Sequence, residues 1–184
     1  MQRSDAPIAW IERWFEDRRP AFQAVLDLIG GHAAVLADFG TNPPPEPRFG
    51  QDWFPGLDGA AAYALVRAGR PARILEIGSG HSTRFLARAV ADEGIDCDIH
   101  CIDPAPRADI TRLPVTLHAT VLGDLAPSAL PTVASGDVLF VDSSHLALPG
   151  RDVERIFGEI LPSLPAGILV HVHDILLPDP YPEA

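Results

Sequence analysis

A glycine-rich turn between an apolar strand and a helix constrains the fold of this chain more than any other feature. Residues 74–77 read as a largely apolar strand, Gly78-Ser79-Gly80 follows, and a helical pattern begins directly after it. A strand that turns at once into a helix leaves backbone N–H groups unpaired, and these can bind a polar or anionic ligand. Glycines at 78 and 80 let the backbone approach such a ligand closely. The turn therefore predicts a cofactor site.

An acidic residue at the end of the next strand narrows the kind of cofactor. Asp103 ends a predicted strand at 97–103, about 20 residues beyond the glycine turn, where an acid can accept hydrogen bonds from ribose hydroxyls. Together the two features predict a cofactor that contains a nucleoside.

The order of apolar patterns predicts an α/β fold with a doubly wound, Rossmann-like and mostly parallel sheet, because strands alternate with helices. The expected elements are strands at 73–78, 97–103, 115–121, 137–142 and 167–174, with helices at 82–92 and 151–161.

The residues before this alternation predict a helical appendage. Two helical patterns occupy 8–38, with Pro20 opening the second and Gly30-Gly31 weakening it. The proline-rich run 41–47 predicts a stiff extended linker, and 57–68 predicts a further helix. We expect N-terminal helices and a linker over 1–49 and the cofactor-binding core over 50–184.

Composition excludes several classes of protein. A formal net charge of −11, with all 14 cationic residues being arginine, argues against a nucleic-acid partner. The apolar segment 167–177 is interrupted by His171, His173 and Asp174, which predicts no membrane span, and the charged N-terminus is not a signal peptide. Cys97 and Cys101 lie four apart on one strand, roughly 13 Å from each other, too far for a disulfide. A cytoplasmic location is expected.

Polar and acidic groups stand at the carboxyl ends of several predicted strands. In open parallel sheets ligands bind at this edge. The groups are Gly78-Ser-Gly80, Asp103, Asp142-Ser-Ser-His145 and His173-Asp174. Their convergence predicts a functional site.

Taken together, these motifs resemble those of class I S-adenosylmethionine (SAM)-dependent methyltransferases. The finer pattern is similar to a subgroup of small-molecule O-methyltransferases related to cephalosporin hydroxylase and to macrolide and rhamnosyl O-methyltransferases. The segments that carry the resemblance are Trp53-Phe-Pro-Gly-Leu-Asp58, Leu75-Glu-Ile-Gly-Ser-Gly-His-Ser-Thr83, Leu139-Phe-Val-Asp-Ser-Ser-His145 and His171-Val-His-Asp-Ile175.

The resemblance implies a set of cofactor-binding residues. Gly78, Ser79 and Gly80 would pass under the methionine part of SAM, and Asp103 would bind its ribose. Ser82 and Thr83 would hydrogen-bond the cofactor's carboxylate. Glu76 would face the same pocket, and Asp124 would lie near the adenine.

The resemblance also implies a divalent cation held by Asp142, His173 and Asp174. Carboxylate oxygens suit Mg²⁺, whereas a histidine favours Mn²⁺, Fe²⁺ or Zn²⁺, or indicates that no metal binds. His145 is the candidate general base, because histidine ordinarily titrates near neutral pH. The structural alternatives are that His145 is a surface loop histidine and that Asp142 hydrogen-bonds loop amides.

The predicted function is transfer of a methyl group from SAM to a hydroxyl of a small molecule, such as a sugar or natural product. One alternative is an NAD(P)-dependent oxidoreductase, although Thr83 occupies the place of its third small residue. Another is a non-catalytic or truncated SAM-binding protein, since the last two strands of such sheets are not found in this sequence. The exposed edge that this leaves predicts a homo-oligomer.

Overall fold

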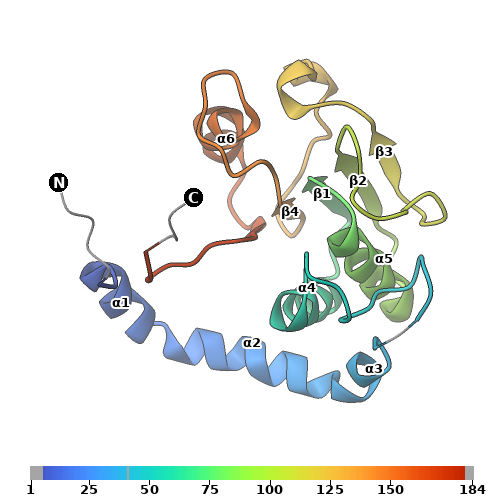
Figure 1. Ribbon diagram of the computed structural model, residues 1–184, viewed down its shortest axis with the longest axis vertical. Coiled ribbons are helices and arrows are strands. Elements are labelled where there is room, and N and C mark those ends of the chain that lie inside the picture. Colours follow the sequence, from blue (N-terminus) through green and yellow to red (C-terminus); the bar gives the residue numbers. More distant parts are fainter. Residues whose placement is uncertain (1–5, 41, 181–184) are drawn as a thin grey trace.

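The computed structural model describes residues 6–40 and 42–180 and consists of a parallel sheet between two layers of helices (Figure 1). The strands are β1 (Arg73–Ile77), β2 (Asp98–Ile102), β3 (Thr116–His118), β4 (Val138–Val141) and β5 (Leu169–Val172). The larger helices are α1 (Ala9–Glu16), α2 (Arg19–Gly31), α4 (Gly56–Gly69) and α5 (His81–Glu93). Shorter ones are α3 (Ala33–Ala37), α6 (Asp152–Arg155), α7 (Leu161–Ser163) and the 3₁₀ turns η1 (Leu122–Asp124) and η2 (Pro127–Ala129).

The five strands are all parallel in the order β3-β2-β1-β4-β5, which confirms the predicted doubly wound sheet. The chain builds outward from β1 in one direction and then returns to build outward in the other. The strand order therefore reverses between β1 and β4, and ligands bind at such a switch point. The Gly78 turn and Asp142 follow these two central strands.

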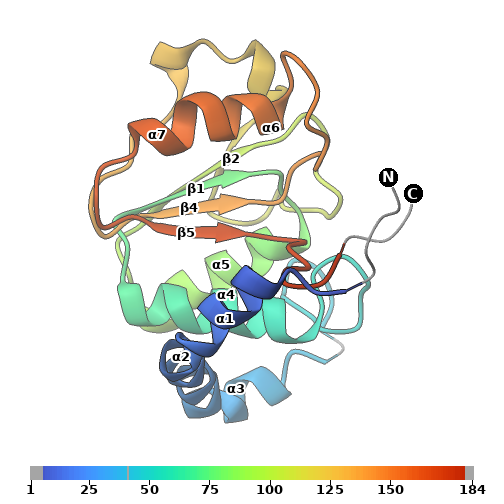
Figure 2. The ribbon, with the colours of Figure 1, turned by 90° about the vertical axis from the view of Figure 1, so that its left-hand side faces the viewer.

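Each face of the sheet buries a separate apolar cluster, because successive strand residues point to opposite faces. On one face Ile74 and Phe140 pack with Phe85 of α5 and Tyr63 of α4. On the other face the cluster contains Leu75, Ile77, Leu139, Val141, Ile156 and Ile160. Figure 2 shows α4 and α5 below the sheet and α6 and α7 above it.

Several element boundaries differ from the prediction. The helical pattern at 8–38 forms three helices, since α2 ends at Gly31 and α3 starts after His32. The helix predicted at 151–161 contains a π-helical segment at Ile156–Ile160. The third strand is only three residues long, because the chain leaves the sheet after His118.

The proline-rich segment is a turn and not the extended linker that we predicted. Thr41 lies outside the described residues, and Glu46 N–H donates to the carbonyl of Pro43 at 3.1 Å. Arg88 of α5 pairs with Glu46 at 2.6 Å and Arg112 donates to the Pro44 carbonyl, so both side chains hold the turn against the core.

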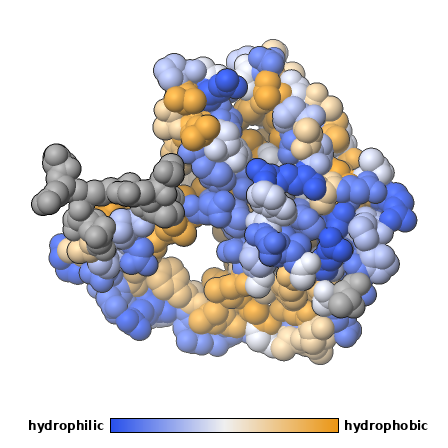
Figure 3. Space-filling view, viewed as in Figure 1, coloured by the Kyte–Doolittle hydropathy of each residue, from blue (hydrophilic) through white to orange (hydrophobic). Residues whose placement is uncertain are grey.

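The N-terminal helices α1 and α2 form an arm, residues 9–31, that arches beside the body of the protein and is joined to it at both ends (Figure 1). α2 packs against α4, and Leu36 and Phe39 beyond it belong to the same apolar cluster as Phe85. Figure 3 shows an open gap between the arm and the sheet side of the molecule. Trp10 is 65% exposed and Leu26 is 46% exposed. The division into two domains at residue 50 stays a prediction.

No helix in the described part of the chain is long and apolar enough to cross a membrane. Cys97 and Cys101 are both free thiols, as predicted, and Cys101 is buried.

Tyr63 joins α4 to α5 and gives a direct test of this packing. Its side chain is fully buried, and its hydroxyl donates to Asp92 Oδ2 at 2.6 Å and accepts from Arg67 at 2.8 Å. Tyr63→Phe leaves both partners without this hydroxyl and is expected to lower the free energy of unfolding by about 1–2 kcal/mol. Urea denaturation measures the change. The control Ser128→Ala removes an exposed hydroxyl and should lower the free energy of unfolding by less than about 0.5 kcal/mol. Equal losses in the two variants would mean that the buried Tyr63 hydroxyl does not stabilise the contact between α4 and α5.

Candidate functional site

The glycine turn after β1 has a backbone shape that requires glycine. Gly78 has a φ of +81°, and its N–H donates to the carbonyl of Ile102 on β2 at 3.0 Å. A Cβ at this position would lie 1.7 Å from the carbonyl oxygen of Asp142. The turn therefore touches the strand end that carries Asp142, and the two predicted motifs meet through their backbones.

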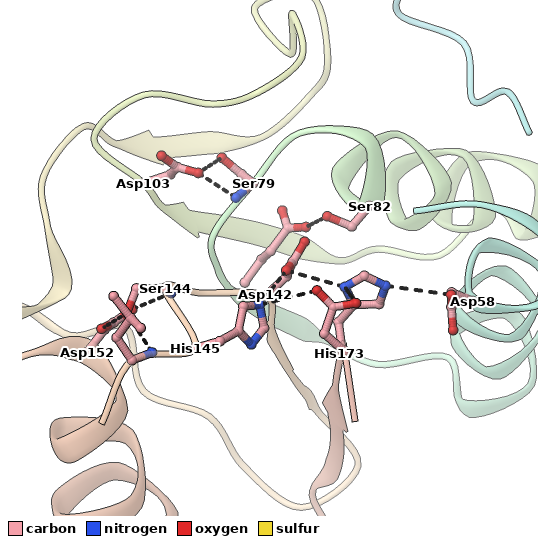
Figure 4. Close-up of polar contacts among 12 residues, drawn as sticks. Asp58, Ser79, Ser82, Asp103, Asp142, Ser144, His145, Asp152 and His173 are labelled. Carbon is pink, nitrogen blue, oxygen red and sulfur yellow. Dashed lines mark hydrogen bonds and ion pairs between the residues drawn. The ribbon is translucent and has the colours of Figure 1, made fainter. Parts of the chain in front are cut away.

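Asp103 fixes the turn from the other side. Its Oδ2 accepts the backbone N–H of Ser79 at 2.6 Å and the Ser79 hydroxyl at 3.2 Å, while Oδ1 accepts the N–H of Ala105 at 2.7 Å (Figure 4). A carboxylate holds the loops after β1 and β2 together in this way. Asp103 also lines the large pocket described below. Its predicted contact with a ribose stays a prediction.

Glu76 is fully buried beneath the turn and organises the start of α5. Its carboxylate accepts from the hydroxyls of Ser82 and Thr83, each at 2.7 Å, and from the thiol of Cys101 at 3.1 Å. Burial raises the pKa of Glu76 to about 7, although the three donors act to lower it. Ser82 and Thr83 therefore direct their hydroxyls toward Glu76, and none of the three residues lines the large pocket.

The raised pKa of Glu76 predicts a pH-dependent stability. Because the folded-state pKa of about 7 exceeds the ordinary glutamate value of 4.5, the stabilising contribution of protonated Glu76 is complete below pH 4.5 and is lost as pH rises through 7. Between pH 5.5 and 8 the wild-type protein should lose about 2 kcal/mol of unfolding free energy relative to Glu76→Gln. Urea denaturation of both proteins across this range measures the difference. Two parallel stability profiles would show that Glu76 ionises normally.

A cluster of aspartate and histidine side chains lies where β4 and β5 end (Figure 4). His145 Nε2 is 3.3 Å from Asp142 Oδ1 and 3.6 Å from Asp174 Oδ2. These three residues offer ligand atoms that all lie within 4.8 Å of one another. His145 and Asp174 both have a φ of +57°, in the left-handed region that residues other than glycine seldom adopt. A strained backbone at two residues of one cluster is typical of a functional site.

His173 lies on the buried side of this cluster. It is 6% exposed, its Nδ1 is 3.3 Å from Asp142 Oδ1 and 3.5 Å from Asp174 Oδ1, and its Nε2 is 3.6 Å from Asp58 Oδ2. Nδ1 makes no well-aligned hydrogen bond. Burial acts to lower the pKa of His173, but the nearby carboxylates, Asp142 first, raise it overall.

Asp142 is the centre of the cluster because both histidines contact it. Burial acts to raise the pKa of Asp142, yet interactions with His173 and then His145 lower it below its usual value. His171, two residues before His173 and on the same face of β5, packs on the ring of Phe140 at 4.6 Å. Burial lowers the pKa of His171 to about 4, so this half-buried side chain is neutral near pH 7.

The pocket at this edge of the sheet has a volume of about 800 Å³. Six predicted site residues line it, and the described structure brings them together from the segments that follow the five strands: Gly78, Asp103, Asp124, Asp142, His145 and Asp174. Glu76, Ser79, Gly80, Ser82, Thr83 and His173 lie behind this wall.

The loop after β4 carries His145 into the pocket. Ser144 donates its backbone N–H and its hydroxyl to Asp152 at 2.7 and 2.6 Å, which ties the loop to the start of α6. Leu146 and Leu148 of the same loop are about half exposed and also line the pocket. The pocket wall formed by this loop is therefore partly apolar.

The sequence reasoning missed three residues. Asp58, at the start of α4, faces His173. It belongs to a segment that carries the family resemblance, but no role was predicted for it. Arg107 and Arg151 line the pocket as its two arginines. Arg107 follows Asp103 by four positions, so a search of that strand-end loop for cations would have found it. Trp53 lines the pocket, whereas its neighbour Phe54 is buried in the core.

Comparison with known proteins supports one family. A family model described as a methyltransferase domain matches residues 75–175. A solved structure titled "cmcI-N160 SAH" has a similar fold, with a TM-score of 0.54, 18% sequence identity, and coverage of 96% of this chain and 80% of the other. Another, "cmcI-D160 Mg-SAM", has a TM-score of 0.49 and 18% identity and covers 74% and 69% of the two chains. No curated protein matches.

Proposed function

The chain belongs to the methyltransferase-domain family, and from that membership we propose that it transfers a methyl group from SAM to a hydroxyl group of a small molecule, such as a sugar or a natural product. The observation that carries the proposal is the pocket in which the glycine turn, Asp103 and Asp142 meet at the switch point of the sheet. A structure of similar fold bears a title with SAH, the demethylated product of SAM, which supports the same cofactor.

The residues at the turn fit a cofactor of this kind. Gly78 lines the pocket, whose volume of about 800 Å³ lies within the range of small-molecule sites. Asp103 stands where it can accept from a ribose, and Asp124 lines the pocket on the η1 side, next to Leu122. Bound SAM would supply an electrophilic methyl group for in-line displacement by the substrate oxygen.

His145 is the proposed general base. Its imidazole is 39% exposed and lines the pocket, so a substrate hydroxyl can reach it. Asp142 contacts His145 Nε2 and so holds the ring at the pocket wall. His173 in turn contacts Asp142 from the buried side, which fixes the carboxylate between the two rings. These residues orient the acceptor oxygen and receive its proton.

A divalent cation also fits the cluster. Asp142 and Asp174 are the proposed carboxylate ligands, with His145 completing the accessible set and His173 facing both carboxylates from behind. A mixed carboxylate and imidazole set favours Mn²⁺, Fe²⁺ or Zn²⁺ over Mg²⁺. The cation would lower the pKa of a substrate hydroxyl that it binds.

Calorimetric titration with SAM and SAH tests the proposal, followed by methyl transfer from labelled SAM to a panel of hydroxylated small molecules. Binding of both ligands and labelled product with one class of acceptor are expected. Tight NAD binding without SAM binding would instead identify an oxidoreductase. SAM binding with no transfer to any acceptor, with or without metal, would identify a non-catalytic binding protein.

Metal dependence separates the two roles of His145, because one nitrogen cannot accept a proton and bind a cation at once. Transfer that survives EDTA supports the base role of His145, because no cation is then required. Transfer that EDTA abolishes and Mn²⁺ restores supports the ligand role of the cluster Asp142, His145 and Asp174.

A homo-oligomer that covers β5 is part of the proposal. β5 is the last strand of the sheet, and Leu169 and Val170 on it are each over one third exposed. The arm also exposes apolar side chains, such as Trp10. Exposed strand edges are usually covered. Sedimentation equilibrium should give a mass above that of one chain, and a single-chain mass at all concentrations would refute this part.

A further inference from the structure

Arg107 and Trp53 form a stacked pair at the wall of the pocket. The guanidinium carbon of Arg107 lies 3.9 Å from the centre of the Trp53 ring, and both residues line the pocket. Trp53 comes from the segment before α4, whereas Arg107 comes from the loop after β2. A planar guanidinium that stacks on an aromatic ring keeps its N–H donors free at the edge.

The backbone of Arg107 is fixed directly against the glycine turn. Its N–H donates to the carbonyl of Ser79 at 3.3 Å, and a Cβ on Gly80 would lie 3.4 Å from the Cβ of Arg107. Among residues 6–40 and 42–180 the Arg107 guanidinium makes no ion pair. A cation without an acidic partner is therefore held beside the turn where the methionine part of the cofactor is expected.

The charges around the pocket are unevenly distributed. Acidic side chains dominate its lining: Asp103, Asp124, Asp142, Asp152 and Asp174. The side next to the glycine turn is cationic, because Arg107 lines the pocket there. An anionic group is favoured on this side and a cationic group near Asp142.

The hydroxyls first expected to bind the cofactor's carboxylate are engaged elsewhere. Ser82 and Thr83 both donate to Glu76. A ligand carboxylate at the turn therefore needs another charged donor, and Arg107 is the cation that lines the pocket on this side.

We propose that Arg107, held in place by Trp53, binds the carboxylate of the amino-acid part of SAM. The inference rests on the proposed cofactor. It places the carboxylate beside Arg107 and directs the positively charged sulfonium toward Asp142. Charge-assisted, bidentate hydrogen bonds between arginine and a carboxylate give both binding energy and a fixed orientation.

The test compares SAH with 5′-methylthioadenosine, which keeps the adenosine and the sulfur but lacks the amino-acid carboxylate. Calorimetry measures the Kd of each ligand for the wild-type protein and for Arg107→Met. The variant should bind SAH about tenfold or more weakly, since a hydrogen bond to a charged group is lost. Its Kd for 5′-methylthioadenosine should change by less than about twofold.

Arg151→Met is the matched control, because it removes the other arginine of the pocket, on the side of α6. It should leave both Kd values within about twofold of the wild type. Arg107 is exposed, so the variant is expected to fold, and circular dichroism checks this.

Four results would overturn the inference, and a fifth would overturn the proposed cofactor. Equal weakening of both ligands would mean that Arg107 supports the adenosine side or the pocket wall. Unchanged SAH binding together with a raised KM for the acceptor would assign Arg107 to the substrate. Equal weakening of SAH by Arg151→Met would show a general charge effect. If wild-type protein binds 5′-methylthioadenosine and SAH equally well, the carboxylate has no partner; if it binds neither, the proposed cofactor itself is wrong.

Discussion

Gly78→Ala is expected to remove about 4 kcal/mol or more of the free energy of unfolding. The added Cβ would lie 1.7 Å from the carbonyl oxygen of Asp142, in a backbone with a φ of +81°. Neither the turn nor the end of β4 can move away without breaking hydrogen bonds, because Gly78 N–H is donated to Ile102 and Asp142 N–H to Ile77. Urea denaturation measures the loss, and calorimetry should show no SAH binding.

Gly94→Ala separates backbone strain from the clash. Gly94 ends α5 with a φ of +59°, and an added Cβ would meet nothing within 4 Å. Its cost should therefore be only the strain of a left-handed residue, about 1 kcal/mol. If Gly78→Ala costs no more than Gly94→Ala, the contact between the turn and Asp142 does not constrain the fold.

Asp142→Asn is expected to lower kcat for methyl transfer by about 10³-fold, within the range that acid–base groups contribute. The amide keeps the size of the side chain but loses the charge that both His145 and His173 contact. SAH affinity should change by less than about threefold, since the change leaves the backbone at Gly78 intact. Transfer is measured with the acceptor found by screening, and Mn²⁺ binding is measured in parallel.

Asp98→Asn removes the same charge from an exposed position at the start of β2, at the opposite end of the strands. It should leave kcat and the Kd for SAH within about twofold of the wild type, and the free energy of unfolding within about 0.5 kcal/mol. A loss of transfer in Asp98→Asn equal to that in Asp142→Asn would mean that net charge, and not the cluster, limits the reaction.

The sheet was predictable because buried parallel strands have a continuous apolar pattern. Residues 138–141 are all buried, as such a run requires. The limits of β3 were not predictable, since its residues are largely exposed and their pattern does not end where pairing ends. The proline-rich turn was also missed, because contacts from Arg88 and Arg112, far away in sequence, determine it.

The location of the site was predictable, whereas its internal contacts were not. Strand ends in a parallel sheet must share one edge, so Asp103, Asp142 and Asp174 could be grouped from their positions. The direction of each histidine depends on local backbone angles, and the left-handed φ at 145 has no pattern in the sequence. Likewise, the choice of Glu76 as acceptor for Ser82 and Thr83 depends on burial that only the packed fold creates.

The hydrogen bond from Ile8 N–H to the carbonyl of Pro178, at 2.8 Å, ties the start of α1 to the segment that follows Asp174. When either segment moves away, this hydrogen bond breaks and the other segment is released. The start of α1 and the segment after β5 are therefore expected to open together. Ile11 is the buried residue of α1, so little apolar surface opposes this opening. The rate of amide hydrogen exchange in α1 therefore measures how often the pocket wall beside Asp174 opens.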